Sequence, residues 1–217
     1  MGPRPPLWND RVQAGQQLAT ALHGWRWDPE TLVLGLPRGG IVVAAEVAKQ
    51  LQRPLHSWAV RKLAHPANPE LALGAIAPGG LVIWEEPFAR LDPKLRAALM
   101  AEQDCELRRR QQRYGDPPIE RLRDKPVIVV DDGVATGLSV RAAIQSLRAA
   151  NVSKLVLAVP IIEQHVAQQL RPLVDGLVAL ATVDDFGAVG VWYRHFDPVQ
   201  DHDVITILAT ANAMNDA

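Results

Sequence analysis

The chain has 217 residues, of which 48% are hydrophobic and 22% are charged, and its formal net charge is −1. This composition is typical of a soluble globular protein, and a charge so close to zero argues against a broad nucleic-acid-binding surface. The single cysteine, Cys105, excludes an internal disulfide framework, and no apolar run is long enough to span a membrane or to form a secretion signal. We therefore expect one cytoplasmic domain, residues 1–217, without membrane contact.

The first predicted element is a helix near the N-terminus. Asn9 or Asp10 can cap it, and we expect Val12, Leu18 and Leu22 to form its apolar stripe. Such a stripe predicts that the helix packs against the rest of the chain.

Strand and helix patterns then alternate along the chain. Short apolar runs predict strands at residues 31–36, 55–60, 81–84, 127–130, 154–159 and 177–181. Apolar residues at helical spacing predict helices at residues 41–51, 94–113, 139–147, 163–170 and around 204–208. This alternation favours an α/β fold, in which an open parallel sheet is flanked by helices and joined by right-handed crossovers.

A glycine-rich turn of sequence PRGG, residues 37–40, joins the first strand to the next helix. The backbone N–H groups of Gly39 and Gly40 at the helix start, together with the guanidinium of Arg38, suit an anion. The alternative is a plain strand-to-helix turn whose glycines allow close packing.

Two cations, Arg61 and Lys62, follow the next predicted strand. Residues at the carboxyl end of a parallel strand lie on the side of the sheet where ligands bind. They are therefore candidate anion ligands, and a solvated basic pair is the alternative. The following segment, residues 63–80, is rich in proline and glycine and predicts a loop with a β-hairpin.

The densest basic run of the chain, Arg108–Arg113, ends the helix predicted at 94–113. Basic residues at a helix C-terminus complement the helix dipole and are usually solvated. We favour this interpretation over contact with nucleic acid because no aromatic residue interleaves with the run.

The most informative stretch is residues 126–147. A β-branched strand is followed by two acids, by a loop of small and hydroxyl-bearing residues, and by a helix. The unpaired N–H groups of the helix start attract a phosphate, to which Thr136 and Ser139 can donate hydroxyl hydrogen bonds. Gly137 lets the backbone approach that phosphate closely.

The two acids, Asp131 and Asp132, repel an anion, so we do not expect them to touch the phosphate. They should face hydroxyl groups or a hydrated cation. Ribose 5-phosphate satisfies both halves of the stretch, because its phosphate suits the loop and its hydroxyls can donate to the carboxylates. The loop is neither a Walker A sequence nor a dinucleotide-binding one.

This stretch resembles the phosphoribosyl-pyrophosphate (PRPP) motif of the type I phosphoribosyltransferases, in which two acids after a strand precede a Thr-Gly run that ends in a hydroxyl residue. The resemblance covers about residues 31–181, which would form the core of the open parallel sheet. It implies a flexible hairpin loop at residues 63–80, a helical insertion at about 92–113, and a small hood built from the N-terminal helix and residues 183–217.

The resemblance also implies an activity, the transfer of a 5-phosphoribosyl group from PRPP to a nitrogen acceptor such as a nucleobase. Pyrophosphate would be released, and Mg²⁺ would be the cofactor. Asp131 and Asp132 would be the catalytic residues, and with Asp185 they would be the metal ligands. The 5-phosphate would be held by Val134, Ala135, Thr136, Gly137, Leu138 and Ser139. The pyrophosphate would be held by Arg38, Gly39, Gly40, Arg61 and Lys62.

Aromatic residues follow the last predicted strand, at Phe186, Trp192 and Tyr193. In purine-type members of the family a similar stretch stacks on the base, so these residues are the candidate acceptor ligands. The alternative is that they pack around the C-terminal helix at residues 204–208.

We expect PRPP and a small-molecule acceptor as partners, and a homodimer is left open. A regulatory protein that senses PRPP or a nucleotide on the same fold is the alternative function, because fold does not determine function. A phosphatase of phosphosugars is the third interpretation, and it would require one of the acids to act as a nucleophile.

Overall fold

The computed structural model describes residues 5–25 and 28–213 of the chain. Its strands are β1 (Leu32–Gly35), β2 (Leu55–Ser57), β3 (Arg61–His65), β4 (Asn68–Ala77), β5 (Leu81–Trp84), β6 (Pro126–Val130), β7 (Lys154–Glu163) and β8 (Gly176–Val183). Its α-helices are α1 (Arg11–Leu22), α2 (Gly39–Leu51), α3 (Pro93–Tyr114), α4 (Leu138–Ala149), α5 (Gln164–Leu170) and α6 (Asp201–Ala213). Among these described helices, none combines the length and the apolar character needed to cross a membrane.

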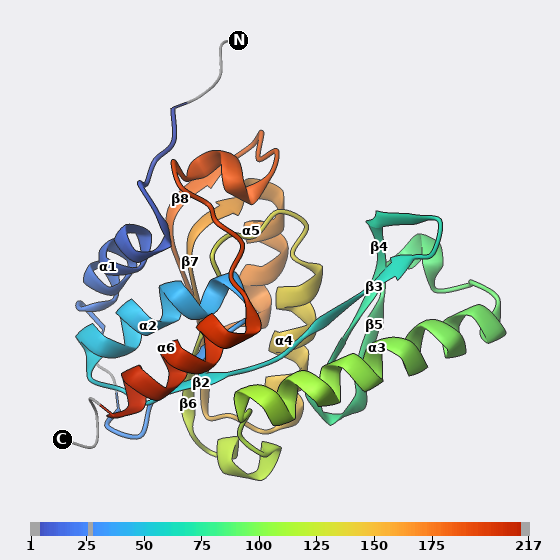
Figure 1. The fold of residues 1–217 in the computed structure, drawn as a ribbon, viewed down its shortest axis with the longest axis horizontal. Helices are drawn as coiled ribbons and strands as arrows, with labels where there is room; N and C mark the ends of the chain where they lie inside the picture. The colour runs from blue at the N-terminus through green and yellow to red at the C-terminus, as the bar shows by residue number, and fades with distance from the viewer. Residues whose placement is uncertain (1–4, 26–27, 214–217) are drawn as a thin grey trace.

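The strands form two sheets (Figure 1). A five-stranded parallel sheet has the order β2-β1-β6-β7-β8, and a three-stranded antiparallel sheet has the order β3-β4-β5. Helices cover both faces of the parallel sheet. The α/β fold with an open parallel sheet, predicted from the alternation of elements, is therefore confirmed.

The parallel sheet is buried on both faces, as its β-branched strands require. In β6, Ile128 and Val130 pack with residues of α1, α2 and α6, whereas Val127 and Val129 pack with residues of α4 and α5. Successive side chains of a strand point to opposite faces, so each strand of this kind contributes to both helix layers. The sheet thereby fixes where each strand ends, and the residues after β6 lie at the middle of its carboxyl edge.

The N-terminal helix is capped as predicted, because the Asp10 carboxylate accepts a hydrogen bond from Gln13 N. Its apolar stripe differs from the prediction at Val12, which is exposed. At about 100° per residue, Val12 lies on the side of the helix opposite Ala14. The buried face consists of Arg11, Ala14, Gly15, Leu18, Ala19 and Leu22.

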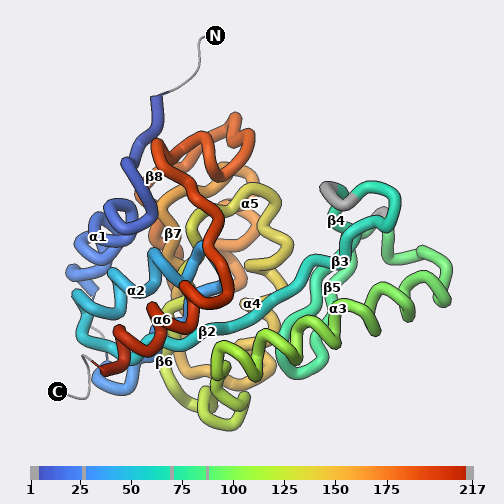
Figure 2. Tube along the Cα trace, viewed as in Figure 1, coloured from blue at the N-terminus to red at the C-terminus, as the bar shows by residue number. Residues whose placement is uncertain are grey.

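A second unit, which we call the arm, consists of β3, β4, β5 and α3. It extends to one side of the parallel sheet (Figure 1, Figure 2). α3 packs on the antiparallel strands through Leu107, which shares a buried cluster with Leu63 and Ile76. The hairpin predicted within residues 63–80, the strand predicted at 81–84 and the helical insertion are therefore parts of one structure.

The strand predicted over residues 55–60 is shorter than expected, which changes the place of Arg61 and Lys62. β2 is an edge strand that pairs with β1, and β1 ends at Gly35. After the hydrogen bond from Trp58 N to Gly35 O, the chain leaves the parallel sheet and continues as β3. Arg61 and Lys62 therefore begin an antiparallel strand of the arm and do not follow a parallel strand.

Asp116 joins the end of α3 to the segment through which the chain leaves the parallel sheet. Its Oδ2 accepts a hydrogen bond from Ala59 N at 2.7 Å, and burial raises the pKa of this carboxyl to about 6. The native state therefore binds the proton more tightly than the unfolded chain does. The contribution of Asp116 to the free energy of unfolding should consequently fall as the pH rises from 3.8 to about 6.

Urea unfolding of Asp116→Asn across this pH range should lack that part of the pH dependence, because the amide does not titrate and its oxygen can still accept from Ala59 N. Asp184→Asn, which changes an exposed carboxylate of the hood, is the matched control and should follow the wild type. Equal pH dependence in the wild type and Asp116→Asn would show that Asp116 is not the group responsible.

Candidate active site

The central motif lies at the carboxyl end of β6, the middle strand of the parallel sheet. Asp131 and Asp132 follow the strand directly, and the first turn of α4 contains no acidic residue. Gly137 precedes α4 with a φ of +72°, and a Cβ there would lie 2.5 Å from Cγ1 of Val166. Glycine is therefore required at this position. No acidic side chain of α4 itself is available to pair with the unpaired N–H groups at the start of this helix. These N–H groups therefore favour the binding of an anion.

The loop before α4 is held by an extension of β7. This strand continues past the predicted residue 159 as far as Glu163. Val134 N donates to Ile161 O at 2.9 Å, and Glu163 N donates to Val134 O at 3.0 Å. The middle of the loop is therefore bonded like a short piece of the parallel sheet.

A cavity of 220 Å³ lies over the motif. Both acids and all six residues predicted to bind the 5-phosphate line it, together with one residue of the arm and one of the hood. Its residues are Lys62, Asp131, Asp132, Gly133, Val134, Ala135, Thr136, Gly137, Leu138, Ser139, Val140 and Val189. The structure thus brings the two halves of the motif to one cavity, and their binding roles stay a prediction.

The PRGG turn lies against the two acids. A Cβ on Gly39 would overlap Oδ2 of Asp132, and a Cβ on Gly40 would lie 2.9 Å from Oδ1 of Asp131. The peptide bond between residues 37 and 38 is cis. Both glycines are thus required for the close approach of two loops, as the packing alternative states, and anion binding by this turn stays a prediction.

The three cations predicted to bind pyrophosphate point in different directions. Lys62 lines the cavity. Arg61, its neighbour on β3, points to the opposite side of the strand and donates from Nε and Nη2 to Oε1 of Gln103, at 3.1 and 2.9 Å. Nη1 of Arg38 lies 3.7 Å from Oδ1 of Asp201, the first residue of α6. The structure therefore brings Lys62 to the acids, but not the guanidiniums of Arg38 and Arg61.

Asp132 is held by residues of the hood. Its Oδ2 accepts from Nε of Arg11 at 2.7 Å, and its backbone oxygen accepts from the Tyr193 hydroxyl at 2.6 Å. Asp132 N donates to Oδ1 of Asp131 at 2.9 Å. Burial and then the charge of Asp132 raise the pKa of Asp131 well above its usual value, an effect that Lys62 opposes. The two carboxylates are therefore unequal, because Asp132 has its own cation and Asp131 lies in the more costly environment.

Arg11 is the site residue that sequence reasoning missed. Its side chain is 10% exposed, its Nη1 donates to the Asp197 backbone oxygen at 2.9 Å, and its guanidinium lies 3.7 Å from the ring centre of Phe196. It belongs to the buried face of α1 with Leu18. The sequence does contain a signal for Arg11, because an arginine lies at helical spacing from apolar residues of α1 such as Leu18. Assigning Val12 to the apolar face places Arg11 outside it, so the signal was missed.

The aromatic residues predicted to bind the acceptor are buried. Phe186, Trp192 and Tyr193 share one cluster with Trp8, whose ring centre lies 5.5 Å from that of Tyr193. The alternative partner, the helix around residues 204–208, is wrong, because the buried residues of α6 belong to another cluster. Acceptor binding by these rings stays a prediction.

The predicted metal ligands Asp131, Asp132 and Asp185 are not brought together. Within residues 5–25 and 28–213, no group of three His, Cys, Asp or Glu side chains could hold a metal ion. The reason is topological, since β8, which precedes Asp185, is separated from β6 by β7. Asp131 and Asp132 still supply carboxylate oxygens, which fit Mg²⁺, because this ion commonly binds one or two carboxylates together with substrate phosphates.

Comparison with known proteins tests the family that the central motif predicts. A family model described as a phosphoribosyl transferase domain matches residues 8–175. A Mycobacterium tuberculosis protein, named as a candidate phosphoribosyl transferase in two strains, is 42% identical over 211 residues, which are 95% of this chain and 47% of that protein. A Thermus thermophilus protein of known crystal structure has 38% identity and a TM-score of 0.75, with 94% of this chain and 98% of that chain covered. The chain spans about half the length of the curated relatives it matches.

An open parallel sheet with paired acids at the carboxyl end of its middle strand, and with a glycine turn after the neighbouring strand β1, is the architecture expected of a type I phosphoribosyltransferase. The chain belongs to the phosphoribosyl transferase domain family, as its central motif predicts. The names of the Mycobacterium relatives specify no acceptor, so membership of the family leaves the acceptor open.

Proposed function

We propose that the chain transfers the 5-phosphoribosyl group of PRPP to a nitrogen acceptor, such as a nucleobase, and releases diphosphate. The observation that carries this proposal is the 220 Å³ cavity, in which a helix start without acidic residues lies beside two carboxylates. A phosphate suits the helix start, and the hydroxyls of a ribose suit the carboxylates. A role in cytoplasmic nucleotide metabolism follows from this proposal.

The loop residues would bind the 5-phosphate and so fix the position of the ribose. N–H groups at the start of α4 and the hydroxyls of Thr136 and Ser139 would donate to the phosphate oxygens. Asp131 and Asp132 would accept from the ribose hydroxyls and stabilise the positive charge that develops at the anomeric carbon. Rate acceleration then comes from positioning and electrostatics, and no nucleophilic side chain is needed.

The diphosphate of PRPP would lie toward Lys62 and the N–H groups of the PRGG turn. Lys62 lines the cavity, and the turn touches both acids. When bound, Mg²⁺ would neutralise charge on the leaving diphosphate. Asp131 is the better placed of the two acids to hold the ion, because Oδ2 of Asp132 is already paired with Arg11.

A protein that binds PRPP without turning it over is the second candidate. The ion pair between Arg11 and Asp132 favours it, because Arg11 neutralises one of the two charges that would stabilise the transition state. The two candidates differ in one product. A transferase releases diphosphate when PRPP and its acceptor are both supplied, whereas a sensor binds PRPP and releases none.

Titration calorimetry with PRPP is the test. We expect micromolar binding that strengthens when Mg²⁺ is added. Thr136→Val, which removes an exposed hydroxyl of the loop and keeps the side-chain shape, should weaken binding about tenfold. Thr20→Val is the matched control, because Thr20 is exposed on α1 and its hydroxyl donates to Gln16 O. Absence of PRPP binding by the wild type, or equal binding by both variants, would refute the assigned site.

A further inference from the structure

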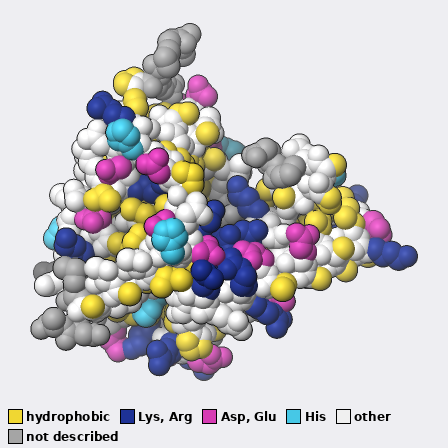
Figure 3. Space-filling view, in the orientation of Figure 1, with side chains coloured by type: hydrophobic (Ala, Val, Ile, Leu, Met, Phe, Trp, Pro, Cys, Tyr) yellow, Lys and Arg dark blue, Asp and Glu magenta, His cyan; other side chains and the backbone are white. Residues whose placement is uncertain are grey.

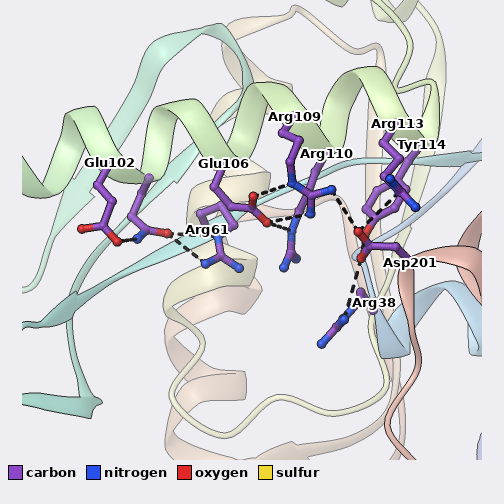
Figure 4. A network of polar contacts seen from close by, with 10 residues as sticks. Arg38, Arg61, Glu102, Glu106, Arg109, Arg110, Arg113, Tyr114 and Asp201 are labelled. Carbon is purple, nitrogen blue, oxygen red and sulfur yellow. Dashed lines mark hydrogen bonds and ion pairs between the residues drawn. The ribbon is translucent and has the colours of Figure 1, made fainter.

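The prediction that the basic run Arg108–Arg113 is simply solvated is wrong for most of its members. In Figure 4 three of its arginines pair with Glu106 of α3 or with Asp201 of α6, namely Arg109, Arg110 and Arg113. The charge of this run is therefore largely balanced within the chain. Figure 3 shows Lys and Arg side chains in a second place, along the lower edge of the molecule, below the parallel sheet. A basic site with no internal counter-ion is therefore to be sought there.

A second cavity, of 470 Å³, lies at the edge of the parallel sheet where the strands begin. It is lined by Leu32, the first residue of β1, and by Lys125, which directly precedes β6. The PRGG turn and the two acids follow the other ends of these same strands. β1 has four residues, which span about 13 Å, so the two cavities lie on opposite sides of the sheet and are separate.

Two basic side chains of the second cavity have no partner. His56 is half-buried on β2, and Arg121 is exposed on a short 3₁₀ helix, η3 (Ile119–Leu122). Within residues 5–25 and 28–213, neither side chain makes a hydrogen bond or an ion pair. Burial, and then the charge of Arg121, lower the pKa of His56. The two groups are therefore close enough to repel each other, and no counter-ion lies between them.

The second cavity also contains one ion pair. Lys125 pairs with Glu30, the one acid among the described residues that line this cavity. Because these two charges cancel, the guanidinium of Arg121 leaves the cavity positively charged even when His56 is neutral. A positively charged cavity attracts an anion.

The rest of the lining is apolar. Pro117 is buried, Leu32 and Pro54 are half-buried, and Pro29 is exposed. The proline rings are rigid and their nitrogens carry no hydrogen, so this wall offers apolar contact but few polar groups. A volume of 470 Å³ is within the range of small-molecule sites. The cavity thus suits a molecule that has an anionic end and an apolar part.

We propose that this second cavity binds a phosphorylated organic molecule, with its phosphate between His56 and Arg121 and its apolar part against Leu32 and the prolines. A guanidinium binds phosphate oxygens through two parallel hydrogen bonds, and an imidazole ring donates another. A phosphate carries nearly two negative charges at neutral pH, which match a guanidinium and a protonated imidazole. No residue of this cavity lines the 220 Å³ cavity, so the inference does not rest on the proposed function.

A bound phosphate changes the titration of His56. In the free protein the charged groups around this imidazole are Arg121, Lys125 and Glu30, and the last two neutralise each other. A phosphate beside the ring favours the protonated imidazole and so opposes the effect of Arg121. The pKa of His56 therefore rises when the ligand binds, which a merely structural role of His56 would not produce.

Proton NMR of the imidazole signals, with phenyl phosphate as the probe, is the test. The signal of His56 is assigned by its loss in His56→Gln. In the wild type it should move saturably, with a Kd of about 1 mM or tighter, and the pKa of His56 should rise. Arg121→Gln should weaken binding at least about fivefold. Arg123→Gln is the matched control, because Arg123 is exposed two residues further on and does not line the cavity.

Three results would overturn the proposal. They are an unmoved His56 signal in the wild type, equal binding by Arg121→Gln and Arg123→Gln, and a pKa of His56 that does not rise. Inorganic phosphate, which lacks an apolar part, should bind at least about fivefold more weakly than phenyl phosphate. Equal affinity for the two probes would refute the assignment of the apolar wall.

A variant of the other cavity keeps the two sites apart. Thr136→Val should leave the response of His56 to phenyl phosphate unchanged, because Thr136 lines the 220 Å³ cavity. Loss of the response in this variant would show that the probe acts through that cavity, and would overturn the second site. If the protein does not bind PRPP but His56 still responds to phenyl phosphate, the proposed function fails and the second site stands.

Discussion

Replacing Gly39 by alanine should abolish measurable PRPP binding and lower the free energy of unfolding by about 3 kcal/mol. The added Cβ would overlap Oδ2 of Asp132 and would lie 3.0 Å from Nε of Arg11. The carboxylate cannot move away freely, because it is paired with Arg11 at 2.7 Å and both side chains are largely buried. Either the PRGG turn retreats or the ion pair breaks, and each outcome alters the site.

Gly24→Ala is the matched control for this substitution. A Cβ at Gly24 would have no atom within 4 Å. The variant should therefore keep the wild-type free energy of unfolding and the wild-type affinity for PRPP. Calorimetry gives the affinity, and urea unfolding gives the stability. A Gly39→Ala protein with wild-type PRPP affinity would show that the contact between the PRGG turn and Asp132 is not part of the binding site.

Asp132→Asn should have the second large effect, on both stability and turnover. Arg11 is 10% exposed and Asp132 14%, so the substitution leaves a nearly buried guanidinium without its carboxylate, at a cost of about 3 kcal/mol. If the proposed function holds, diphosphate release from PRPP should slow about 100-fold, because the substitution would remove one of the two charges proposed to stabilise the anomeric carbon. The bond from the Tyr193 hydroxyl should persist, since it uses the backbone oxygen.

A double-mutant cycle separates these two effects. Arg11→Gln combined with Asp132→Asn removes both charges, so the double variant should be more stable than the sum of the single losses predicts. Its turnover should nevertheless stay low. Strictly additive stability losses would show that the pair is not energetically coupled. Normal turnover in Asp132→Asn would remove Asp132 from the catalytic residues.

The central part of the fold could be read from the sequence because its signals are local. The β-branched strand, the two acids and the helix after Gly137 are consecutive, and the structure places them in that order around one cavity. The place where the chain leaves the sheet could not be read. Trp58, Ala59 and Val60 are as apolar and buried as strand residues, and β2 ends because its neighbour ends at Gly35.

The surroundings of charged residues were the second feature that the sequence did not predict. Arg11 and Arg110 look solvated in a sequence, since long charged side chains usually are. Their burial depends on which other element faces them, the hood in one case and β3 with the PRGG turn in the other. The partners of Arg11 come from tertiary packing, so no pattern within α1 alone specifies them, whereas Arg110 pairs with Glu106 one turn away on α3 itself. The acid pair, in contrast, was found because its position after a strand already determines its surroundings.

The hydrogen bonds between the extended β7 and Val134 mean that the middle of the loop before α4 takes its shape during folding. A flexible loop would have to lose backbone entropy at each binding event, and that loss would be subtracted from the affinity for the ligand. Here the backbone entropy of the middle of the loop is lost during folding, in the same cooperative transition that forms the sheet. The middle of the loop is therefore preorganised, and a ligand that bound there would lose little affinity to the ordering of this part of the backbone.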